Sequence, residues 1–225
     1  MLPGVDDGAK DVEESIAMLG MLSEQNIDTV CATPHFYANH MTVEEFLSRR
    51  GEAAEKLADS APSNSPRILL GAEVKYYPGI SKMPQLFDLG IEGTRVLLLE
   101  MPHAEWTEYT RRELVELSGA NQMTIMLAHV ERYYKFQPER TWERLYDNGI
   151  LAQVNASFFR GIMTRRRAIS MLCEGRVHFI GSDCHNTSSR APDIGSAYEI
   201  IGKKFGEGFL CEMDDFGRSM MLADD

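Results

Sequence analysis

Polar side chains that can bind metal ions recur along this 225-residue chain at a nearly regular spacing. Each of them closes a short apolar run, and the series is His35, Glu73, Glu100, His129, Asn155 and Asp183, with His185 two positions further on. The steps along the series are 38, 27, 29, 26 and 28 residues, which is close to one strand plus one helix each. Mixed histidine and carboxylate sets suit Mn, Fe or Zn, whereas oxygen-only sets suit Mg or Ca. The pattern therefore predicts a multinuclear metal site.

Taken singly, a histidine or carboxylate at a strand end is more often a capped or salt-bridged loop residue than a ligand. Six consecutive strand ends with residues that can bind a metal ion or a phosphate are much harder to explain in that way. Asp183 and His185 form the most specific local pair, because residues two apart on a strand point to the same side.

Two arginines follow the predicted ligands closely. Arg132 comes after His129 in AHVERY, and Arg190 comes after His185 in CHNTSSR. Guanidinium groups beside a metal cluster bind phosphate oxygens bidentately, although either arginine could also be an ordinary loop residue. The more basic stretch RGIMTRRRA begins a predicted helix. We interpret it as a solvated helix face or the edge of a protein-substrate groove, and not as catalytic.

A second phosphate chemistry is carried by Cys184 and Arg190, which match the C-x5-R spacing of cysteine-dependent tyrosine phosphatases. In those enzymes the thiolate attacks phosphorus. Here the neighbouring Asp183 disfavours a thiolate, and the loop between the two residues contains no glycine. We therefore rank this chemistry well below the metal site.

The elements that must position these residues are short apolar runs separated by amphipathic stretches. The runs predict strands at 29–33, 68–74, 96–101, 124–130, 151–155 and 177–182. Thr42 and Glu45 form a capping box that predicts a helix start, and Gly149 and Gly175 predict helix ends. Strand and helix in alternation indicate right-handed βαβ units and a parallel sheet. At the carboxyl rim of a barrel of such units the predicted ligands would converge.

Composition narrows the class of protein. An apolar content of 44% and a charged content of 25% are typical of a globular domain. The net charge of −11 argues against nucleic acid or an anionic membrane as the main partner. We expect no membrane insertion, because no stretch has the length of a spanning helix and the N-terminus lacks a signal pattern. The four cysteines show no paired spacing, which favours a reducing, cytoplasmic setting.

Several blocks, in order along nearly the whole chain, resemble one known family. They are LPGVDDGAKDVEESIAML, DTVCATPHF, GAEVKYY, LLLEMPH, AHVERY, QVNAS and GSDCHN. Together they resemble the capsular polysaccharide biosynthesis phosphatases, which are bacterial manganese-dependent tyrosine phosphatases of the polymerase-and-histidinol-phosphatase (PHP) superfamily. The resemblance implies a distorted, TIM-like (β/α)7 barrel that binds up to three Mn²⁺ ions, with Fe, Zn or Mg as alternatives.

The resemblance also implies the residue roles. The implied metal ligands are Asp7, His35, Glu73, Glu100, His129, Asp183 and His185. Arg132 and Arg190 match arginines that the family places near the phosphate, as catalytic and substrate-binding residues. A metal-activated hydroxide would attack phosphotyrosine without a covalent enzyme intermediate. The implied partner is the phosphorylated tail of a tyrosine kinase that regulates polysaccharide synthesis.

One departure from the family lies at the start of the chain. Family members carry a strand with His-x-His before the LPGVDDG loop, whereas this sequence begins at Met1 inside that loop. We therefore expect one domain over residues 1–225 without that strand, an exposed sheet edge, and weaker metal sites where the two histidines would contribute. A phosphoesterase acting on small phosphate esters and a non-catalytic phosphotyrosine-binding regulator remain the alternatives.

Overall fold

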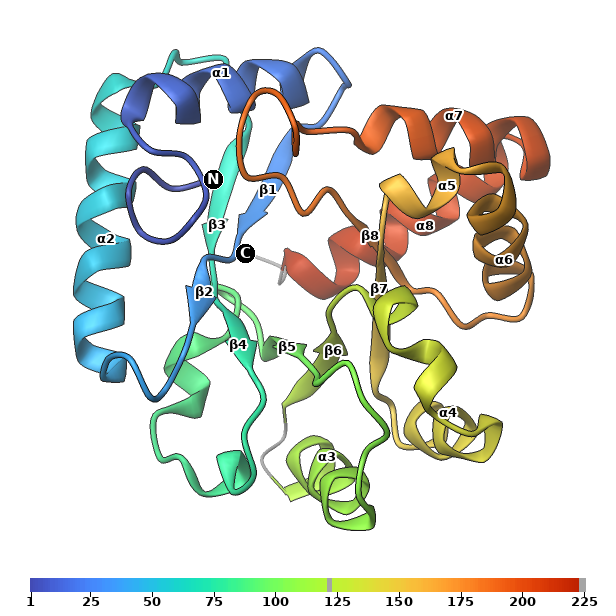
Figure 1. Cartoon of the computed structure of the whole chain (residues 1–225). Helices are drawn as coiled ribbons and strands as arrows, with labels where there is room; N and C mark the ends of the chain where they lie inside the picture. The colour runs from blue at the N-terminus through green and yellow to red at the C-terminus, as the bar shows by residue number, and fades with distance from the viewer. Residues whose placement is uncertain (121–122, 223–225) are drawn as a thin grey trace.

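The computed structural model describes residues 1–120 and 123–222. Its strands surround the centre of the molecule and its helices lie mostly around the outside, as Figure 1 shows. The strands are β1 Thr29–Ala32, β2 His35–Phe36, β3 Arg67–Leu70, β4 Glu73–Lys75, β5 Val96–Glu100, β6 Thr124–Leu127, β7 Leu151–Asn155 and β8 Phe179–Gly181. The helices are α1 Val12–Ser23, α2 Val43–Ser60, α3 Glu108–Ala120, α4 Glu139–Asp147, α5 Ser157–Arg160, α6 Ile162–Cys173, α7 Ile194–Phe205 and α8 Glu207–Met221.

The helix boundaries that the sequence predicted are confirmed. Thr42 and Glu45 form both hydrogen bonds of a capping box at the start of α2, over 3.2 and 2.9 Å. Gly149 and Gly175 have φ angles of +72° and +66° after α4 and α6. Those left-handed conformations are easily adopted by glycine, so each helix stops there and the chain turns into the next strand.

All strand pairs in the described chain are parallel, as predicted, but one predicted strand is divided in two and one short strand, β2, was not predicted. The run at 29–33 ends at Ala32, and β2 begins only after Pro34, which has no N–H to donate. The run at 68–74 is interrupted at Gly71, where a Cβ atom would come within 3.1 Å of the side chains of Ile91 and Thr33. The last predicted strand, 177–182, shortens to β8.

The breaks that follow β1 and β3 produce two sheets. β1 pairs with β3, while β2, β4, β5, β6, β7 and β8 form a curled sheet in that order. Within residues 1–120 and 123–222 no strand pairing joins β8 back to β1 or β2. The predicted α/β fold with a barrel-like parallel sheet is thus confirmed, in the form of a half-barrel that is open between β8 and β1.

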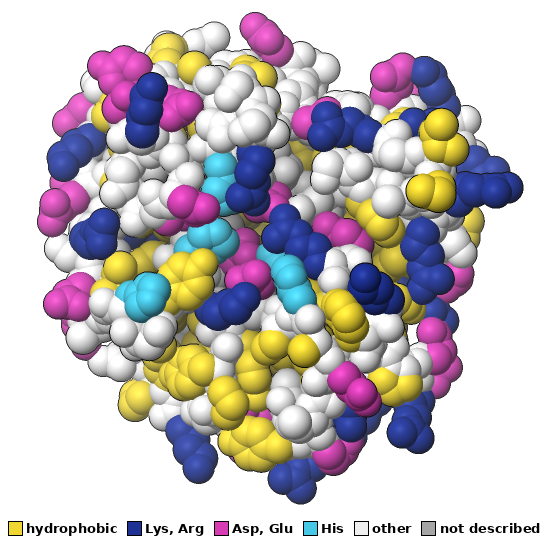
Figure 2. All heavy atoms as spheres, viewed as in Figure 1, with side chains coloured by type: hydrophobic (Ala, Val, Ile, Leu, Met, Phe, Trp, Pro, Cys, Tyr) yellow, Lys and Arg dark blue, Asp and Glu magenta, His cyan; other side chains and the backbone are white. Residues whose placement is uncertain are grey.

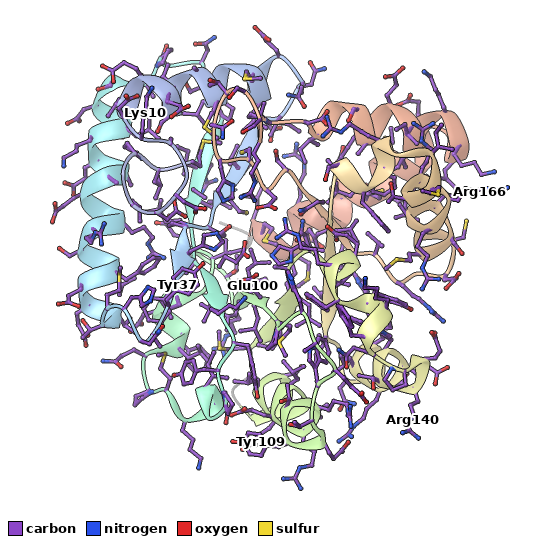
Figure 3. All side chains as sticks on the ribbon, in the orientation of Figure 1. Lys10, Tyr37, Glu100, Tyr109, Arg140 and Arg166 are labelled. Carbon is purple, nitrogen blue, oxygen red and sulfur yellow. The ribbon has the colours of Figure 1, made fainter. Side chains whose placement is uncertain are left out.

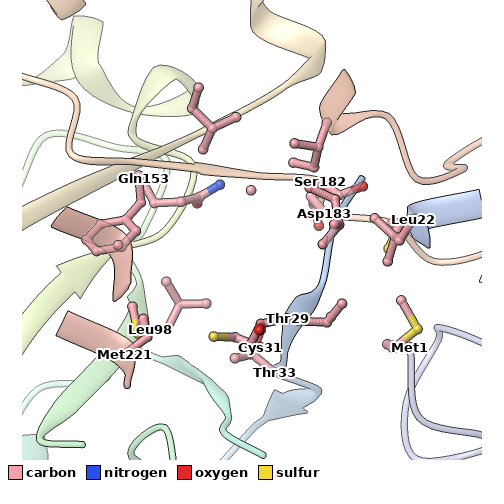
Figure 4. A pocket seen from close by; sticks show the side chains of 18 of the residues that line it. Met1, Leu22, Thr29, Cys31, Thr33, Leu98, Gln153, Ser182, Asp183 and Met221 are labelled. Carbon is pink, nitrogen blue, oxygen red and sulfur yellow. The ribbon is translucent and has the colours of Figure 1, made fainter. Parts of the chain in front are cut away.

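The interior of the half-barrel holds a cavity of about 810 Å³. Figure 4 shows Thr29 and Cys31 of β1, Leu98 of β5, Gln153 of β7 and Met221 of α8 around this space. Helix α8 is tied to the strands on both sides of the gap, because Arg218 donates to Asp28 over 2.7 Å and Phe216 packs on Phe179. The cavity reaches the carboxyl rim, where the predicted ligands lie.

Among the residues that the structure describes, no helix is long and apolar enough to cross a membrane.

Candidate metal centre

The carboxyl rim of the half-barrel brings six of the seven predicted metal ligands together. Figure 2 shows histidine, acidic and basic side chains gathered in the middle of this face. Three overlapping groups each have ligand atoms within 4.8 Å of one another, namely Asp7–His35–His185, His35–Glu73–Glu100 and Glu100–His103–His129. The first two groups share His35 and the last two share Glu100. The predicted convergence is therefore present, and the groups form one continuous cluster.

Glu73, the first residue of β4, lies at the middle of the cluster and is buried. Its Oε1 atom is 2.9 Å from His129 Nε2 and 3.9 Å from His35 Nδ1. Glu100, the last residue of β5, has its Oε1 atom 3.8 Å from the same His129 nitrogen. One carboxylate between two imidazoles is an arrangement in which Glu73 can bridge two cations.

The outer end of the cluster is formed by the loop at the start of the chain. Asp7 Oδ1 lies 3.6 Å from His35 Nε2 and 3.5 Å from His185 Nε2. The neighbouring Asp6 has a different role, because it accepts hydrogen bonds from the backbone N–H groups of Gly8 and His35, each over 2.9 Å. Asp6 thus fixes the loop against β2 and leaves Asp7 as the member of the pair that faces the histidines.

The donor set fits divalent cations. His35 Nδ1 and His185 Nε2 are buried and have no hydrogen-bond partner among the described residues. Buried nitrogen atoms are normally paired, because an unpaired one loses its hydration without compensation. Both nitrogens face carboxylate oxygens at 3.5 to 3.9 Å, which is beyond hydrogen-bonding distance. Imidazoles and carboxylates at this separation can share a cation between them.

Asp183, the seventh predicted ligand, lies outside the three groups. Arg132 and Arg190 both form ion pairs with its carboxylate, and Asn155 Nδ2 donates to Oδ2 over 2.8 Å. Burial raises the pKa of Asp183, but the two guanidinium groups outweigh burial and hold this pKa below its ordinary value. The prediction that Asp183 and His185 share a strand is wrong, because β8 ends at Gly181 and Asp183 has a left-handed φ of +53°.

Gln153, an amide beneath the rim beside the predicted Asn155, was missed from the sequence. Gln153 Oε1 accepts from the backbone N–H of His129 over 2.6 Å, and Gln153 Nε2 donates to Asn155 Oδ1 over 3.1 Å. Asn155 in turn contacts Asp183. His129 has a φ of +34°, a strained value for a residue with a side chain, and the Gln153 amide holds it there. The sequence did contain a signal for Gln153, because residues 153 and 155 of one strand face the same side and Asn155 was already predicted to reach the rim.

Three further residues at the rim were not singled out from the sequence as site residues. Lys75 Nζ donates to Glu100 Oε2 over 2.9 Å, and His103 Nε2 lies 4.0 Å from Glu100 Oε1. The Tyr37 ring is 5.6 Å from the His35 ring, and Figure 3 shows Tyr37 next to Glu100 on this face. Burial, followed by the charges of Glu100 and Asp7, raises the pKa of Tyr37. Lys75 and Tyr37 each lie two positions after a predicted ligand, which is the spacing that could have revealed them.

The thiolate chemistry finds no support at Cys184. Burial is the main cause that raises the pKa of its thiol, so the reactive anion is disfavoured. Arg190, the other half of the C-x5-R match, is paired with Asp183.

Three arginines of the basic stretch at 160–167 form contacts within the molecule. Arg160 pairs with Asp193 over 2.8 Å, Arg165 donates to the Phe159 carbonyl over 2.8 Å, and Arg167 lies over the Tyr134 ring. Arg166 points outward at the periphery in Figure 3. These contacts agree with the interpretation of a helix face.

Comparisons with known proteins agree on one family. The sequence profile described as "Capsular polysaccharide synthesis, CpsB/CapC" matches residues 1–214. The chain is 30% identical to the tyrosine-protein phosphatase CpsB of Streptococcus pneumoniae over 219 residues, which cover 90% of this chain and 87% of that protein. It is 28% identical to the tyrosine-protein phosphatase YwqE of Bacillus subtilis over 216 residues, covering 92% of this chain and 83% of that one.

A solved structure shows the same fold. It comes from the crystal structures of YwqE from Bacillus subtilis and CpsB from Streptococcus pneumoniae, described as unique metal-dependent tyrosine phosphatases. The match has a TM-score of 0.83 and 21% sequence identity, and it covers 100% of this chain and 92% of that chain.

Proposed function

The chain belongs to the capsular polysaccharide synthesis CpsB/CapC family, and from this membership we propose that it is a metal-dependent protein-tyrosine phosphatase. The observation that carries the proposal is the juxtaposition at the rim. A continuous cluster of imidazoles and carboxylates lies beside Asp183, whose carboxylate holds both arginines. The groups proposed to bind cations and the groups proposed to bind phosphate are thus adjacent, as hydrolysis of a phosphate monoester requires.

The residues that would hold the cations are Asp7, His35, Glu73, Glu100, His129 and His185, with Asp183 beside them. We propose Mn²⁺ as the physiological ion, in a cluster of up to three, and Fe, Zn or Mg as competitors for a mixed nitrogen and oxygen donor set. Divalent cations at such a site activate a water molecule for attack on phosphorus and offset the charge of the phosphate. Glu73 and Glu100 would hold the cations in fixed positions, because both are buried, Glu73 as the first residue of β4 and Glu100 as the last residue of β5.

Arg132 and Arg190 are proposed to bind and orient the phosphate oxygens. Both side chains are partly exposed, at 34% and 40%, while the carboxylate that they share is 11% exposed. Their guanidinium groups therefore reach from a buried anchor toward solvent. A planar guanidinium with several N–H donors suits bidentate contact with a phosphoryl group.

The proposed substrate is the phosphorylated tyrosine tail of a kinase that regulates capsular or exopolysaccharide synthesis, as expected for this family. The proposed setting is the cytoplasm, where the four free cysteines, Cys31, Cys173, Cys184 and Cys211, would remain reduced.

The first experiment measures hydrolysis of a phosphotyrosine peptide in the presence of Mn²⁺. Matched samples contain EDTA, a Cys184→Ser substitution, or a small alkyl phosphate ester as the substrate. Turnover that EDTA abolishes and Cys184→Ser leaves unchanged would support the proposal. Preference for the alkyl ester would favour the small-molecule phosphoesterase, and tight peptide binding without turnover would favour a phosphotyrosine-binding regulator.

A further inference from the structure

We propose that His103 is a ligand of the cation that Glu100 and His129 hold. This inference deepens the proposed function and rests on it, because it concerns the same metal centre. His103 follows β5 in the sequence LLLEMPH, three residues after Glu100. It was not among the ligands that either the strand-end pattern or the family resemblance indicated.

The distances around Glu100 Oε1 are those of ligands that share an ion. His103 Nε2 lies 4.0 Å and His129 Nε2 3.8 Å from this oxygen, and the three ligand atoms are all within 4.8 Å of one another. Hydrogen bonds are shorter than this. Ligand atoms held at about 2.1 Å from a common cation lie roughly 3 to 4 Å apart, so a small closure of this triangle would complete the coordination.

The second oxygen of Glu100 is already occupied, which leaves Oε1 for the cation. Lys75 Nζ donates to Oε2 over 2.9 Å. The ammonium group thereby fixes the rotation of the carboxylate and keeps Oε1 turned toward the two imidazoles. Such support from outside the ligand set is a regular feature of metal sites in proteins.

The His103 ring is positioned by aromatic neighbours, and among the described residues its ring nitrogens form no hydrogen bond. Its centroid is 6.2 Å from the His129 ring, edge to face at 87°, and 6.2 Å from the buried Tyr133 ring. Tyr133 is fixed from below, because its hydroxyl donates to the Ala128 carbonyl over 2.6 Å. The backbone is held as well, since Trp106 Nε1 donates to the Pro102 carbonyl over 3.1 Å.

With His103 included, each of the three groups has three protein ligands, and neighbouring groups share one of them. A cation with three protein ligands keeps a coordination position for water or substrate. His103 is also the most solvent-exposed ligand of its group. Its side chain is 47% exposed, compared with 11% for Glu100 and 2% for His129. The cation at this end of the cluster would therefore face the solvent side of the rim.

The test is a metal-binding titration that does not depend on turnover. Mn²⁺ is added to the metal-stripped protein, free Mn²⁺ is followed by electron paramagnetic resonance, and the absorption of bound Co²⁺ reports the ligand set. His103→Phe keeps an aromatic ring against His129 and Tyr133 but removes the ligand nitrogen. His40→Phe makes the same change at an exposed histidine outside the three groups.

We expect His103→Phe to weaken the binding of one Mn²⁺ ion by at least about tenfold and to alter the Co²⁺ spectrum, with His40→Phe unchanged. Unchanged stoichiometry, affinity and spectrum in His103→Phe would overturn the proposal, even if turnover falls. Failure of the wild-type protein to bind either ion would overturn it too. If His103→Phe does not fold, His103→Ala provides the same comparison. Normal metal binding without phosphotyrosine hydrolysis would refute only the proposed function.

Discussion

Arg190 Nη2 lies 2.6 Å from Oδ1 of Asp183, and Arg132 pairs with the other oxygen of the same carboxylate. The two arginines come from different parts of the chain, one from the turn after β6 and the other from the loop after β8. A single carboxylate that is only 11% exposed therefore brings them side by side at the rim. This arrangement would let the two guanidinium groups act on one phosphate, as proposed.

Removing either guanidinium group should weaken catalysis on phosphotyrosine. A charge-assisted hydrogen bond contributes about 1.5 to 3 kcal/mol, so we expect Arg132→Ala or Arg190→Ala to lower kcat/KM roughly tenfold to a hundredfold. Steady-state kinetics on a phosphotyrosine peptide would measure the loss. Arg166→Ala, which removes an outward-pointing arginine on α6, is the matched control. Equal activity in all three variants would refute the phosphate-binding role.

Glu73→Gln should abolish the stabilisation of the protein by Mn²⁺. Cations that bind only the folded state raise its stability by an amount that grows with the logarithm of their affinity, and Glu73 lies between His35 and His129. In thermal unfolding we expect Mn²⁺ to raise the Tm of the wild-type protein but not that of Glu73→Gln. Without metal the two proteins should unfold at similar temperatures. Glu55→Gln, at an exposed position on α2, should respond to Mn²⁺ like the wild-type protein.

Gly181→Ala should impair activity through His129. A Cβ atom at this last residue of β8 would collide with the Gln153 side chain, whose oxygen holds the His129 backbone. Because displacement of a ligand by about 1 Å can cost a hundredfold in rate, we expect a tenfold or greater loss of kcat/KM. Gly208→Ala, where nothing lies within 4 Å of the added atom, should keep full activity. An active Gly181→Ala protein would show that the cavity relaxes around the methyl group.

The order and type of the strands could be predicted because the apolar runs are short, rich in branched residues and followed by capped helices. The convergence of the predicted ligands followed from the parallel strands, although His35 and Glu73 begin β2 and β4 and do not end a strand. The strand breaks were not predictable in the same way. The break within the predicted strand 68–74 depends on Gly71 meeting Ile91, a residue 20 positions away in sequence, and β2 forms beyond Pro34, outside the predicted strand 29–33.

The sequence patterns also did not predict residues whose roles depend on tertiary contacts. Gln153 supports His129 from a neighbouring strand, and His103 reaches the metal centre from a loop that carries no periodic signal. The strand-end pattern indicated correctly that Asp183 reaches the rim. The reasoning that it shares a strand with His185 was wrong, because Asp183 lies in a left-handed turn. Strand-end positions thus indicate which residues reach the rim, whereas side-chain contacts decide what each one touches.

A buried carboxylate outside the metal centre should make stability depend on pH. Glu113 of α3 accepts hydrogen bonds from the Tyr76 hydroxyl over 2.7 Å, the Gly79 N–H over 2.9 Å and the Ser81 hydroxyl over 2.9 Å. Burial raises the pKa of Glu113, but these donors outweigh it and the net pKa is lowered. Glu113 thereby fixes the segment that follows β4, the strand that carries Glu73.

Because the pKa of Glu113 is lower in the folded state than in the unfolded state, its contribution is fully present above the unfolded value of about 4.3. It is lost as the pH falls through the folded value. We expect Glu113→Gln to lower the free energy of unfolding by about 1 to 3 kcal/mol near neutral pH, and by less in acid, where the wild-type carboxylate is itself protonated. Urea unfolding in EDTA over a pH series would measure this difference, with Glu116→Gln, exposed on the same helix, as the control. If the difference in the free energy of unfolding between the wild-type protein and Glu113→Gln stays constant from neutral to acid pH, then side-chain packing, and not the charge of Glu113, holds the segment.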